Sequence, residues 1–485
     1  MLEDTGKNTK YYINSVIGIL FMFGFGFLPP IEPLTALGMK YIGILLGLIY
    51  LWSTVELLWP SILGLAAIVV TGTMSGTAIT SKAFGGDTII LCILSLAVIY
   101  SITNTGAFDY VINWFFKRKI FIGRPWVLST TLLAVMYVVS ILNGGFAMLF
   151  LLWEVVYKIA DQVNISRKSM WCAAMATGMV LAYVYGAAVL PFMPTYLFIM
   201  GLFQSMTGMV SIPMMNALVM NLIIGVATIG LYIVLIRFVL RVNVDALKNA
   251  KMEDLLIPLP PMSKRQKFAA IYLIVFVLAL IVPGSVSTLM AGTAIASFFG
   301  NLGTIGMCFI MFALLCIIKV NGKPILVFRE VAAQVQWEAV SLMAVVFAFA
   351  TMLTAEGTGT AEFIMMLINP IVGGMGAYTF TLFVFIFTII FTNVANNNVV
   401  MVLMITLINV YMPTLNFFLP TMAFLMLYMS QTAFMLPSAS IYGALLHSQA
   451  TIIEKKYIYL CATMTVISAI IMMIVIAIPL TPIIF

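Results

Sequence analysis

The stretch Thr392-Asn393-Val394-Ala395-Asn396-Asn397-Asn398 places four asparagines inside a long apolar run. The flanking residues 380–391 and 399–407 are Phe, Ile, Leu, Val, Met and Thr only. Each asparagine amide has donors and acceptors that hydrocarbon cannot satisfy. Backbone that is not helical is tolerated at membrane depth only where protein or a water-filled cavity surrounds it. The polar island, residues 392–398, therefore predicts a place where something polar is handled inside a membrane.

The composition supports a membrane protein. The chain has 485 residues, of which 63% are hydrophobic and 8% charged, and its mean hydropathy is +1.16. Soluble domains contain about 25% charged residues. We expect about ten to twelve membrane segments, some of them too short or too broken to span. Six have clear apolar cores, at 16–28, 89–102, 217–236, 271–286, 302–318 and 460–480.

The net charge of +7 is informative about topology. Lys and Arg cluster in the segments 117–124, 158–168, 237–267, 319–329 and 455–456, and are missing from 285–301, 352–380 and 413–430. By the positive-inside rule, the first set faces the cytoplasm and the second faces out. We expect a multi-pass protein of the cell membrane, the plasma membrane in a bacterium, with a cytoplasmic N-terminus.

Several functional classes lack support in the sequence. The basic charge is explained by topology and does not indicate nucleic-acid binding. The five cysteines lie in apolar runs without paired spacing, and His447 is the single histidine. We find no metal-ligand spacing, phosphate loop or nucleophile with a partner base. The sequence therefore predicts neither an enzyme nor a cofactor, apart from a sodium ion.

The chain divides into two similar halves. A polar linker at 241–265 separates an N-terminal half, 1–240, from a C-terminal half, 266–485. Each half has an apolar segment with a polar break, an apolar return, and a later segment with a Leu-Pro break. We predict re-entrant helical hairpins around 130–160 and 378–412, and broken transmembrane helices around 171–206 and 421–450. The expected fold is an all-α polytopic membrane protein with two inverted repeats, a layout typical of transporters with a site near the midplane.

The breaks in the C-terminal half contain most of the oxygen ligands. Thr392, Asn397 and Ser440, with the carbonyls of Ala395 and Ala439, suit a hard cation such as sodium, and half-helix N-termini suit an anion. The alternative is a kinked helix whose polar residues pack between helices.

The corresponding break in the N-terminal half is poorer in oxygens. Asn143-Gly144-Gly145 has one polar side chain, and its glycines allow a ligand to approach the backbone closely. Close packing between helices is the alternative role for the glycine pair.

Two carboxylates in apolar surroundings are candidates for function. Glu154 could carry a proton or, as we favour, pair with Lys158 one helical turn away. Glu56 is expected to be a buried hydrogen-bonding anchor.

Three motifs together resemble the divalent-anion/sodium symporter family of the ion transporter superfamily. Residues 51–60, Leu-Trp-Ser-Thr-Val-Glu-Leu-Leu-Trp-Pro, are similar to that family's Trp-Thr-Glu-Ala-Leu-Pro segment. The polar island is similar to its Thr-Glu-Phe-Ala-Ser-Asn-Thr pattern. Residues 433–440, Ala-Phe-Met-Leu-Pro-Ser-Ala-Ser, are similar to its Ala-Phe-Met-Leu-Pro-Val-Ala-Thr-Pro-Pro pattern.

The resemblance implies a homodimer whose transport domain moves against a scaffold domain in an elevator mechanism. It implies di- or tricarboxylate transport, driven by sodium or by anion exchange. By position, a sodium ion would bind at Thr392, Ala395, Asn397 and Ala439. Substrate contacts would lie at Asn143, Gly144, Gly145, Asn396, Asn397, Asn398 and Ser440.

The chain departs from the family pattern at two places. Leu142-Asn143-Gly144 replaces Ser-Asn-Thr, which removes two side-chain oxygens, and Ser440-Ile441 replaces Thr-Pro. We therefore expect an incomplete first cation site and a substrate other than a succinate-like dianion.

The leading hypothesis is a cation-coupled or exchanging carrier of small organic anions. The alternative is a carrier of the same superfamily for another ion, either a sodium/proton antiporter or an inorganic oxyanion transporter. An integral-membrane enzyme is disfavoured because the sequence offers no nucleophile or base.

Overall fold

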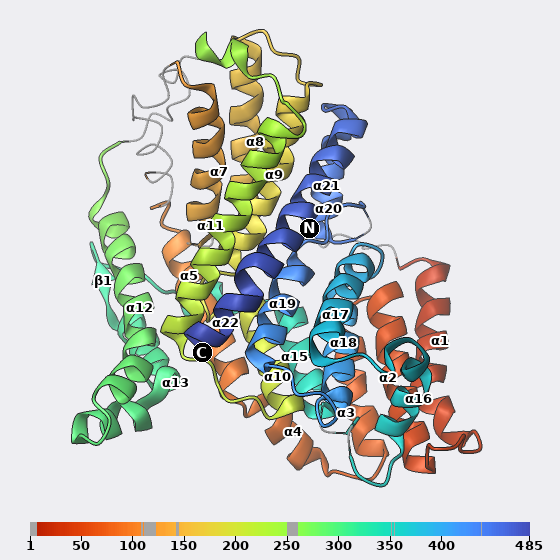
Figure 1. The fold of residues 1–485 in the computed structure, drawn as a ribbon. Helices are drawn as coiled ribbons and strands as arrows, with labels where there is room; N and C mark the ends of the chain where they lie inside the picture. The colour runs from red at the N-terminus through yellow and green to blue at the C-terminus, as the bar shows by residue number, and fades with distance from the viewer. Residues whose placement is uncertain are drawn as a thin grey trace. The chain divides into compact units, whose positions relative to one another are not determined.

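The computed structural model describes residues 7–107, 110, 123–141, 145–249, 260–350, 352–353, 355–437 and 439–485. These residues form helices almost throughout, as predicted. The strands among them are β1 (Lys319–Val320) and β2 (Lys323–Pro324), which pair antiparallel in a short hairpin. The fold is therefore all-helical in its architecture (Figure 1).

The helices are long and apolar enough for a polytopic membrane protein. Within the described residues, seven helical segments could span a membrane, or up to nine if each of two bent pairs is one span. The seven are Thr9–Phe27, Ala36–Thr54, Met170–Ala187, Met214–Phe238, Lys264–Leu289, Ala294–Ile317 and Lys455–Ile484. The bent pairs are Gly76–Phe84 with Asp87–Thr103, at 51°, and Thr360–Val372 with Ala377–Thr392, at 96°. All six predicted apolar cores coincide with these segments to within one residue.

The chain forms two compact units that do not follow the two halves of the sequence. Unit 1 contains Met1–Cys92, Leu197–Ser211 and Gln336–Met426. Unit 2 contains Ile93–Tyr196, Ile212–Val335 and Leu427–Phe485. Each unit thus takes segments from both halves. The division into repeats around a linker at 241–265 stays a prediction.

Unit 1 is built around two buried helices, α2 and α15. Its elements are α1 (Thr9–Gly24), η1 (Phe25–Phe27), α2 (Ala36–Thr54), α3 (Leu58–Val70), α4 (Gly76–Phe84), α15 (Trp337–Phe349), α16 (Thr360–Val372), α17 (Ala377–Thr392) and α18 (Asn397–Tyr411). The side chain of Thr35 caps α2 by accepting from the N–H of Gly38, and it also donates to the carbonyl of Thr358. Across the α2–α3 turn, Trp52 Nε1 donates to Ser61 Oγ at 3.1 Å.

Unit 2 surrounds α9 (Met170–Ala187), whose residues are buried from Trp171 to Gly186. Helices α7 (Pro125–Ile141), α8 (Gly145–Gln162), α11 (Met214–Phe238), α20 (Ile441–Ser448) and α21 (Lys455–Met472) all contact it. The other elements are η3 (Asp245–Asn249), α12 (Lys264–Leu289), α13 (Ala294–Ile317), α14 (Phe328–Ala332), η5 (Gln449–Thr451), η6 (Met473–Ala477) and α22 (Ile478–Ile484). Three helices contribute residues to both units: α5 (Asp87–Thr103), α10 (Pro194–Thr207) and α19 (Leu419–Gln431).

Glycine sets the distance between α7, α9 and α11. A Cβ on Gly186 of α9 would lie 2.6 Å from the carbonyl oxygen of Tyr137 on α7. A Cβ on Gly225 of α11 would lie 2.3 Å from the hydroxyl oxygen of the same tyrosine. Real Cβ atoms do not approach a backbone oxygen this closely, so Gly186 is required for α7 and α9 to pack as they do, whereas a Cβ at Gly225 would require the Tyr137 side chain to shift.

We therefore expect Gly186→Ala to destabilise the protein by about 1–3 kcal/mol, because the added methyl group must push the α7 backbone away. Gly230 of α11 is the matched control. It is exposed, and nothing lies within 4 Å of its Cβ position. Gly230→Ala should be neutral or stabilise by up to about 1 kcal/mol through helix propensity. Thermal unfolding of the purified protein measures both; equal effects of the two changes would contradict the packing.

Candidate functional site

The polar island lies between α17 and α18 of unit 1. Helix α17 ends at Thr392, and α18 begins at Asn397. The side-chain oxygen of Asn396 caps α18 by accepting from the N–H of Asn398 at 3.0 Å. Asn393 Nδ2 donates to the carbonyl of Ile389 at 2.9 Å and so satisfies the end of α17. The asparagines therefore terminate one helix and start the next.

One hydrogen bond joins the two helices across this break. Thr392 Oγ1 donates to Asn397 Oδ1 at 2.8 Å, with Thr392 fully buried and Asn397 half-buried. Both residues are predicted cation ligands. Hydroxyl and amide oxygens each have two lone pairs, so this bond does not prevent either oxygen from coordinating an ion. Ala395, the third predicted ligand in this segment, is also half-buried in the turn.

The polar island and the helices on either side of it contain only neutral side chains. No Asp, Glu, Lys, Arg or His occurs from residue 377 to residue 411. Asn398, one position into α18, is half-buried. The segment can offer amide N–H donors to an anion and oxygen acceptors to a cation, but it cannot neutralise either.

The second predicted break follows α19 and belongs to unit 2. Ser440 Oγ accepts from the N–H of Gly443 at 3.1 Å, which caps α20, and donates to the carbonyl of Ala433. Ala439 is buried, and Ser438 lies outside the described residues. A Cβ on Gly443 would lie 2.4 Å from the carbonyl oxygen of Leu436, so the segment folds tightly against α20. Because the Ser440 proton is already donated, this hydroxyl can offer a ligand only a lone pair.

His447, in the α20 helix that follows this break, forms contacts typical of a structural residue. Its Nε2 lies 2.9 Å from the carbonyl oxygen of Met435, and its ring packs against Tyr459. Since a carbonyl only accepts, Nε2 carries the proton in this arrangement.

The first predicted hairpin is only partly described. Helix α7 ends at Ile141 and α8 begins at Gly145. The predicted substrate contacts Asn143 and Gly144, together with Leu142, lie outside the described residues. These contacts, and that of Gly145, stay predictions.

Asn221 is a buried polar residue that the sequence analysis did not single out. It lies fully buried in α11, inside the apolar core predicted at 217–236. Its Nδ2 donates to the carbonyl of Val189, in the break between α9 and α10, at 3.1 Å. Its Oδ1 accepts from the hydroxyl of Tyr428 on α19 at 2.8 Å. The available signal was a single amide within an otherwise apolar span, where polar side chains commonly join helices.

Buried hydroxyls gather beside this break. Tyr428 packs on Tyr185, with ring centres 4.9 Å apart. The hydroxyls of Tyr137 and Ser140 are buried and have no hydrogen-bond partner within the described part of the chain. Buried polar groups without a protein partner commonly bind ordered water. We expect water at this end of α7 and α9.

Glu56 holds the N-terminal helix of unit 1. The hydroxyl of Tyr11 donates to Glu56 Oε1 at 3.2 Å and accepts from Trp59 Nε1 at 2.9 Å. This half-buried carboxylate therefore joins α1 to the α2–α3 turn.

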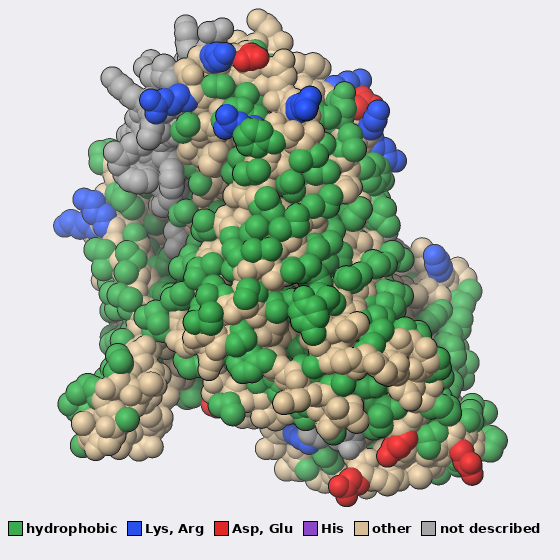
Figure 2. All heavy atoms as spheres, viewed as in Figure 1, with side chains coloured by type: hydrophobic (Ala, Val, Ile, Leu, Met, Phe, Trp, Pro, Cys, Tyr) green, Lys and Arg blue, Asp and Glu red, His purple; other side chains and the backbone are tan. Residues whose placement is uncertain are grey.

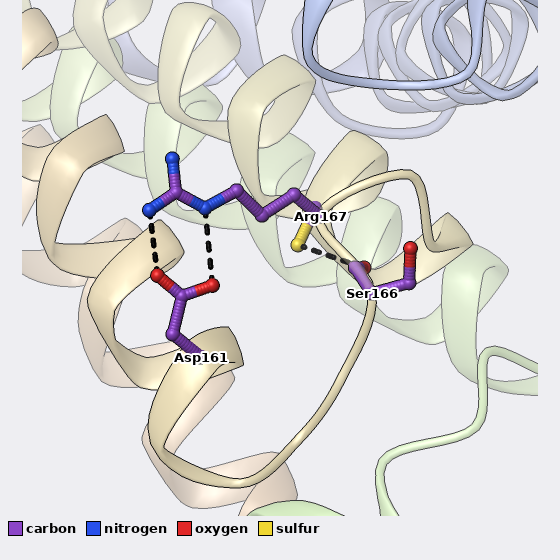
Figure 3. A network of polar contacts seen from close by, with 4 residues as sticks. Asp161, Ser166 and Arg167 are labelled. Carbon is purple, nitrogen blue, oxygen red and sulfur yellow. Dashed lines mark hydrogen bonds and ion pairs between the residues drawn. The ribbon is translucent and has the colours of Figure 1, made fainter.

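The favoured Glu154–Lys158 pair is wrong. Both side chains are exposed on α8, and no ion pair within 4.0 Å joins them. The end of α8 has a different pair, in which Arg167 binds Asp161 through two hydrogen bonds of 3.0 and 2.6 Å (Figure 3). These bonds hold the pKa of Asp161 below its usual value. Since the pair is exposed, it contributes little to stability.

Two further features limit what the units can bind. Among the residues that the structure describes, no group of three or more His, Cys, Asp or Glu could hold a metal ion. A small pocket in unit 1 lies between α2, α10, α15 and α18 and has an entirely apolar lining, which includes Trp52, Phe349 and Val402. Such a lining does not suit a charged solute.

We expect Asn221→Leu to destabilise the protein, because it removes the donor to the buried Val189 carbonyl and leaves the Tyr428 hydroxyl with only its 3.3 Å bond to the backbone carbonyl of residue 221. An unsatisfied buried group costs about 1–3 kcal/mol. Adding Tyr428→Phe should recover part of this loss, which thermal unfolding of the single and double variants measures. Asn216→Leu is a control on the same helix, where the side chain binds Ile484 and is only half-buried. Additive effects of Asn221→Leu and Tyr428→Phe would argue against the shared network.

Comparison with known proteins gives one result. A family model described as citrate transporter matches residues 48–433, which is most of the chain. The match includes the polar island, Asn221 and Glu56, and it ends before Ala439 and Ser440. A search of curated proteins gives no match.

Proposed function

We propose that this chain, which belongs to the citrate transporter family of the ion transporter superfamily, carries a small di- or tricarboxylate across the membrane together with sodium. The family consists of secondary transporters and is not a class of enzymes. The observation that best supports the proposed site is the hydrogen bond between Thr392 and Asn397, which places two oxygen ligands together at a helix break.

The chemistry of the polar island favours a monovalent cation. Thr392 Oγ1, Asn397 Oδ1 and the carbonyl of Ala395 are neutral oxygen ligands. Calcium and magnesium sites normally include carboxylates, and the polar island has none. A sodium ion suits this ligand set of unit 1. The predicted contribution of Ala439, which lies in unit 2, stays a prediction.

The same segment can recognise a carboxylate by hydrogen bonding. The amides of Asn396, Asn397 and Asn398 supply N–H donors, and the N-terminus of α18 adds a favourable dipole. Because no basic side chain is nearby in sequence, a bound cation is the natural source of positive charge for a polyanion. This argument supports coupled transport. Asn143, Gly144 and Gly145 stay predicted substrate contacts. Ser440, the other predicted contact, has already donated its proton to the Ala433 carbonyl and is not part of this proposal.

The homodimer, the scaffold and transport domains, and the elevator motion rest on the resemblance to the divalent-anion/sodium symporters. Anion exchange is the proposed alternative mode of transport. A sodium/proton antiporter is disfavoured because it needs a buried titrating carboxylate. Glu154 is exposed, and Glu56 accepts a hydrogen bond from Tyr11.

We expect Asn397→Ala to lower citrate uptake about tenfold or more, since a hydrogen bond to a charged group contributes about 1.5–3 kcal/mol. The measurement is uptake of labelled citrate by proteoliposomes under a sodium gradient, a proton gradient or counter-exchange. Asn409→Ala, the same substitution in α18 but outside the polar island, is the matched control and should transport normally.

The outcomes separate the site from the function. Normal uptake by Asn397→Ala would refute the site. Failure of the wild-type protein with every di- and tricarboxylate, under all three driving forces, would refute the function.

Sodium dependence tests the cation site separately. If only this one site binds sodium, uptake should follow sodium concentration with a Hill coefficient of about one. Thr392→Val removes one oxygen ligand and should raise the sodium concentration for half-maximal uptake while the saturated rate changes less. A steep, cooperative sodium dependence would contradict a single site.

A further inference from the structure

Helix α11 of unit 2 exposes an apolar stripe along one face. Val226, Gly230, Val234 and Phe238 recur every four residues and therefore lie on the same side of the helix. The side chains of Val226, Val234 and Phe238 are 60%, 46% and 62% exposed. The stripe is about 18 Å long at the rise of an α-helix. It is thus long enough to cover the hydrocarbon thickness of one leaflet, about 15 Å.

Two arginines, Arg237 and Arg241, lie where this stripe ends. Arg237 and Arg241 are exposed, and neither forms an ion pair within the described residues. The Arg237 guanidinium lies over two aromatic rings, 5.4 Å from the ring centre of Trp126 and 5.1 Å from that of Phe238. The apolar face of α11 therefore leads directly to a paired positive charge with an aromatic side chain beside it.

The backbone of Arg241 is unusual. Its φ is +49°, in the left-handed region that glycine normally occupies just beyond the end of a helix. A residue with a Cβ is strained in this conformation. Such strain commonly marks a side chain that is used, and here the side chain supplies the outermost charge at the end of α11.

The surroundings add positive charge. Figure 2 shows Lys and Arg side chains gathered at the end of unit 2 where α8 ends and α9 begins. The basic residues at these helix ends and at the end of α11 are Lys158, Arg167, Lys168, Arg237, Arg241 and Lys248. The carboxylates of Asp161 and Asp245 are already paired with Arg167 and Lys248, which leaves Glu154 as the other exposed carboxylate on α8. An anion that approaches α11 therefore meets a surface with excess positive charge.

We propose that one anionic phospholipid binds along α11. Its acyl chains lie on the stripe from Val226 to Phe238, and its phosphodiester binds Arg237 and Arg241. Trp126 lies at the interfacial level, where Trp is enriched in membrane proteins. Compensation of the α11 dipole accounts for the charge of the arginines, and general contact with lipid accounts for the exposed stripe, but neither accounts for the strained backbone of Arg241 where the stripe ends.

Native mass spectrometry of the purified full chain tests this proposal. The protein is titrated with phosphatidylglycerol and, separately, with phosphatidylcholine of the same acyl chains. Wild type should retain the anionic lipid more strongly. Arg237→Gln with Arg241→Gln should weaken this retention about 25-fold, because each basic residue near the headgroup contributes about fivefold. Lys319→Gln with Lys323→Gln removes two exposed charges elsewhere in unit 2 and should retain the wild-type preference.

Two further arms distinguish a lipid site from a simple anion site and from a loss of folding. Glycerophosphoglycerol, the headgroup without acyl chains, should not displace the lipid at the same concentration, and neither should inorganic phosphate. Arg241→Gly removes the charge and also the strain, so it should lower lipid retention without lowering the unfolding temperature.

Four results would overturn the proposal. The first two are that the arginine variants retain phosphatidylglycerol as well as wild type does, or that the lysine control loses it equally. The third is that the free headgroup or phosphate displaces the lipid. The fourth is that Arg241→Gly loses the lipid only to the extent that the protein unfolds.

Discussion

A helix that breaks inside a membrane leaves backbone carbonyls and N–H groups without partners, and satisfying them is the constraint on which both units depend. In water these groups would be hydrated, whereas in hydrocarbon only protein or trapped water can pair with them. The breaks of this protein meet the constraint with short side chains. At the end of α17, Asn393 donates to a backbone carbonyl, and at the start of α18, Asn396 accepts from a backbone N–H. Elsewhere, Asn221 donates to the Val189 carbonyl and Ser440 donates to the Ala433 carbonyl. Polar residues at the breaks, some of which are candidate ligands, therefore also hydrogen-bond the backbone groups that the breaks leave unpaired.

Because some of these side chains already bind the broken backbone, the candidate ligands differ in the hydrogen-bonding capacity that they have left. Ser440 has donated its proton to a carbonyl and accepts from an N–H, so it has little left for a carboxylate. The bond between Thr392 and Asn397 differs, because it joins two side chains rather than a side chain and the backbone. The polar island is accordingly the place that we propose for the cation.

Local signals in the sequence were sufficient for much of the fold. Runs of apolar residues identify the spanning helices, because length and hydropathy are properties of neighbouring residues. Asparagine clusters and Leu-Pro pairs mark the breaks for the same reason. Contacts between distant residues were not accessible in this way. Asn221 and Tyr428 are 207 positions apart, and nothing near either residue indicates the other. The Glu154–Lys158 prediction failed because helical spacing permits an ion pair without requiring it, and both side chains are exposed. The grouping into two units depends on long-range packing and could not be predicted from the order of the elements.

The close approach of Gly186 and Gly225 to Tyr137 has a consequence for motion. Tyr137 is held between a helix that touches its backbone and another that touches its hydroxyl. Packing this close resists sliding of α7 past α9, so we expect the three helices to move together in any rearrangement of unit 2. The non-helical residues 188–193, which follow α9 directly, are buried and interrupt the helical backbone beside these three helices.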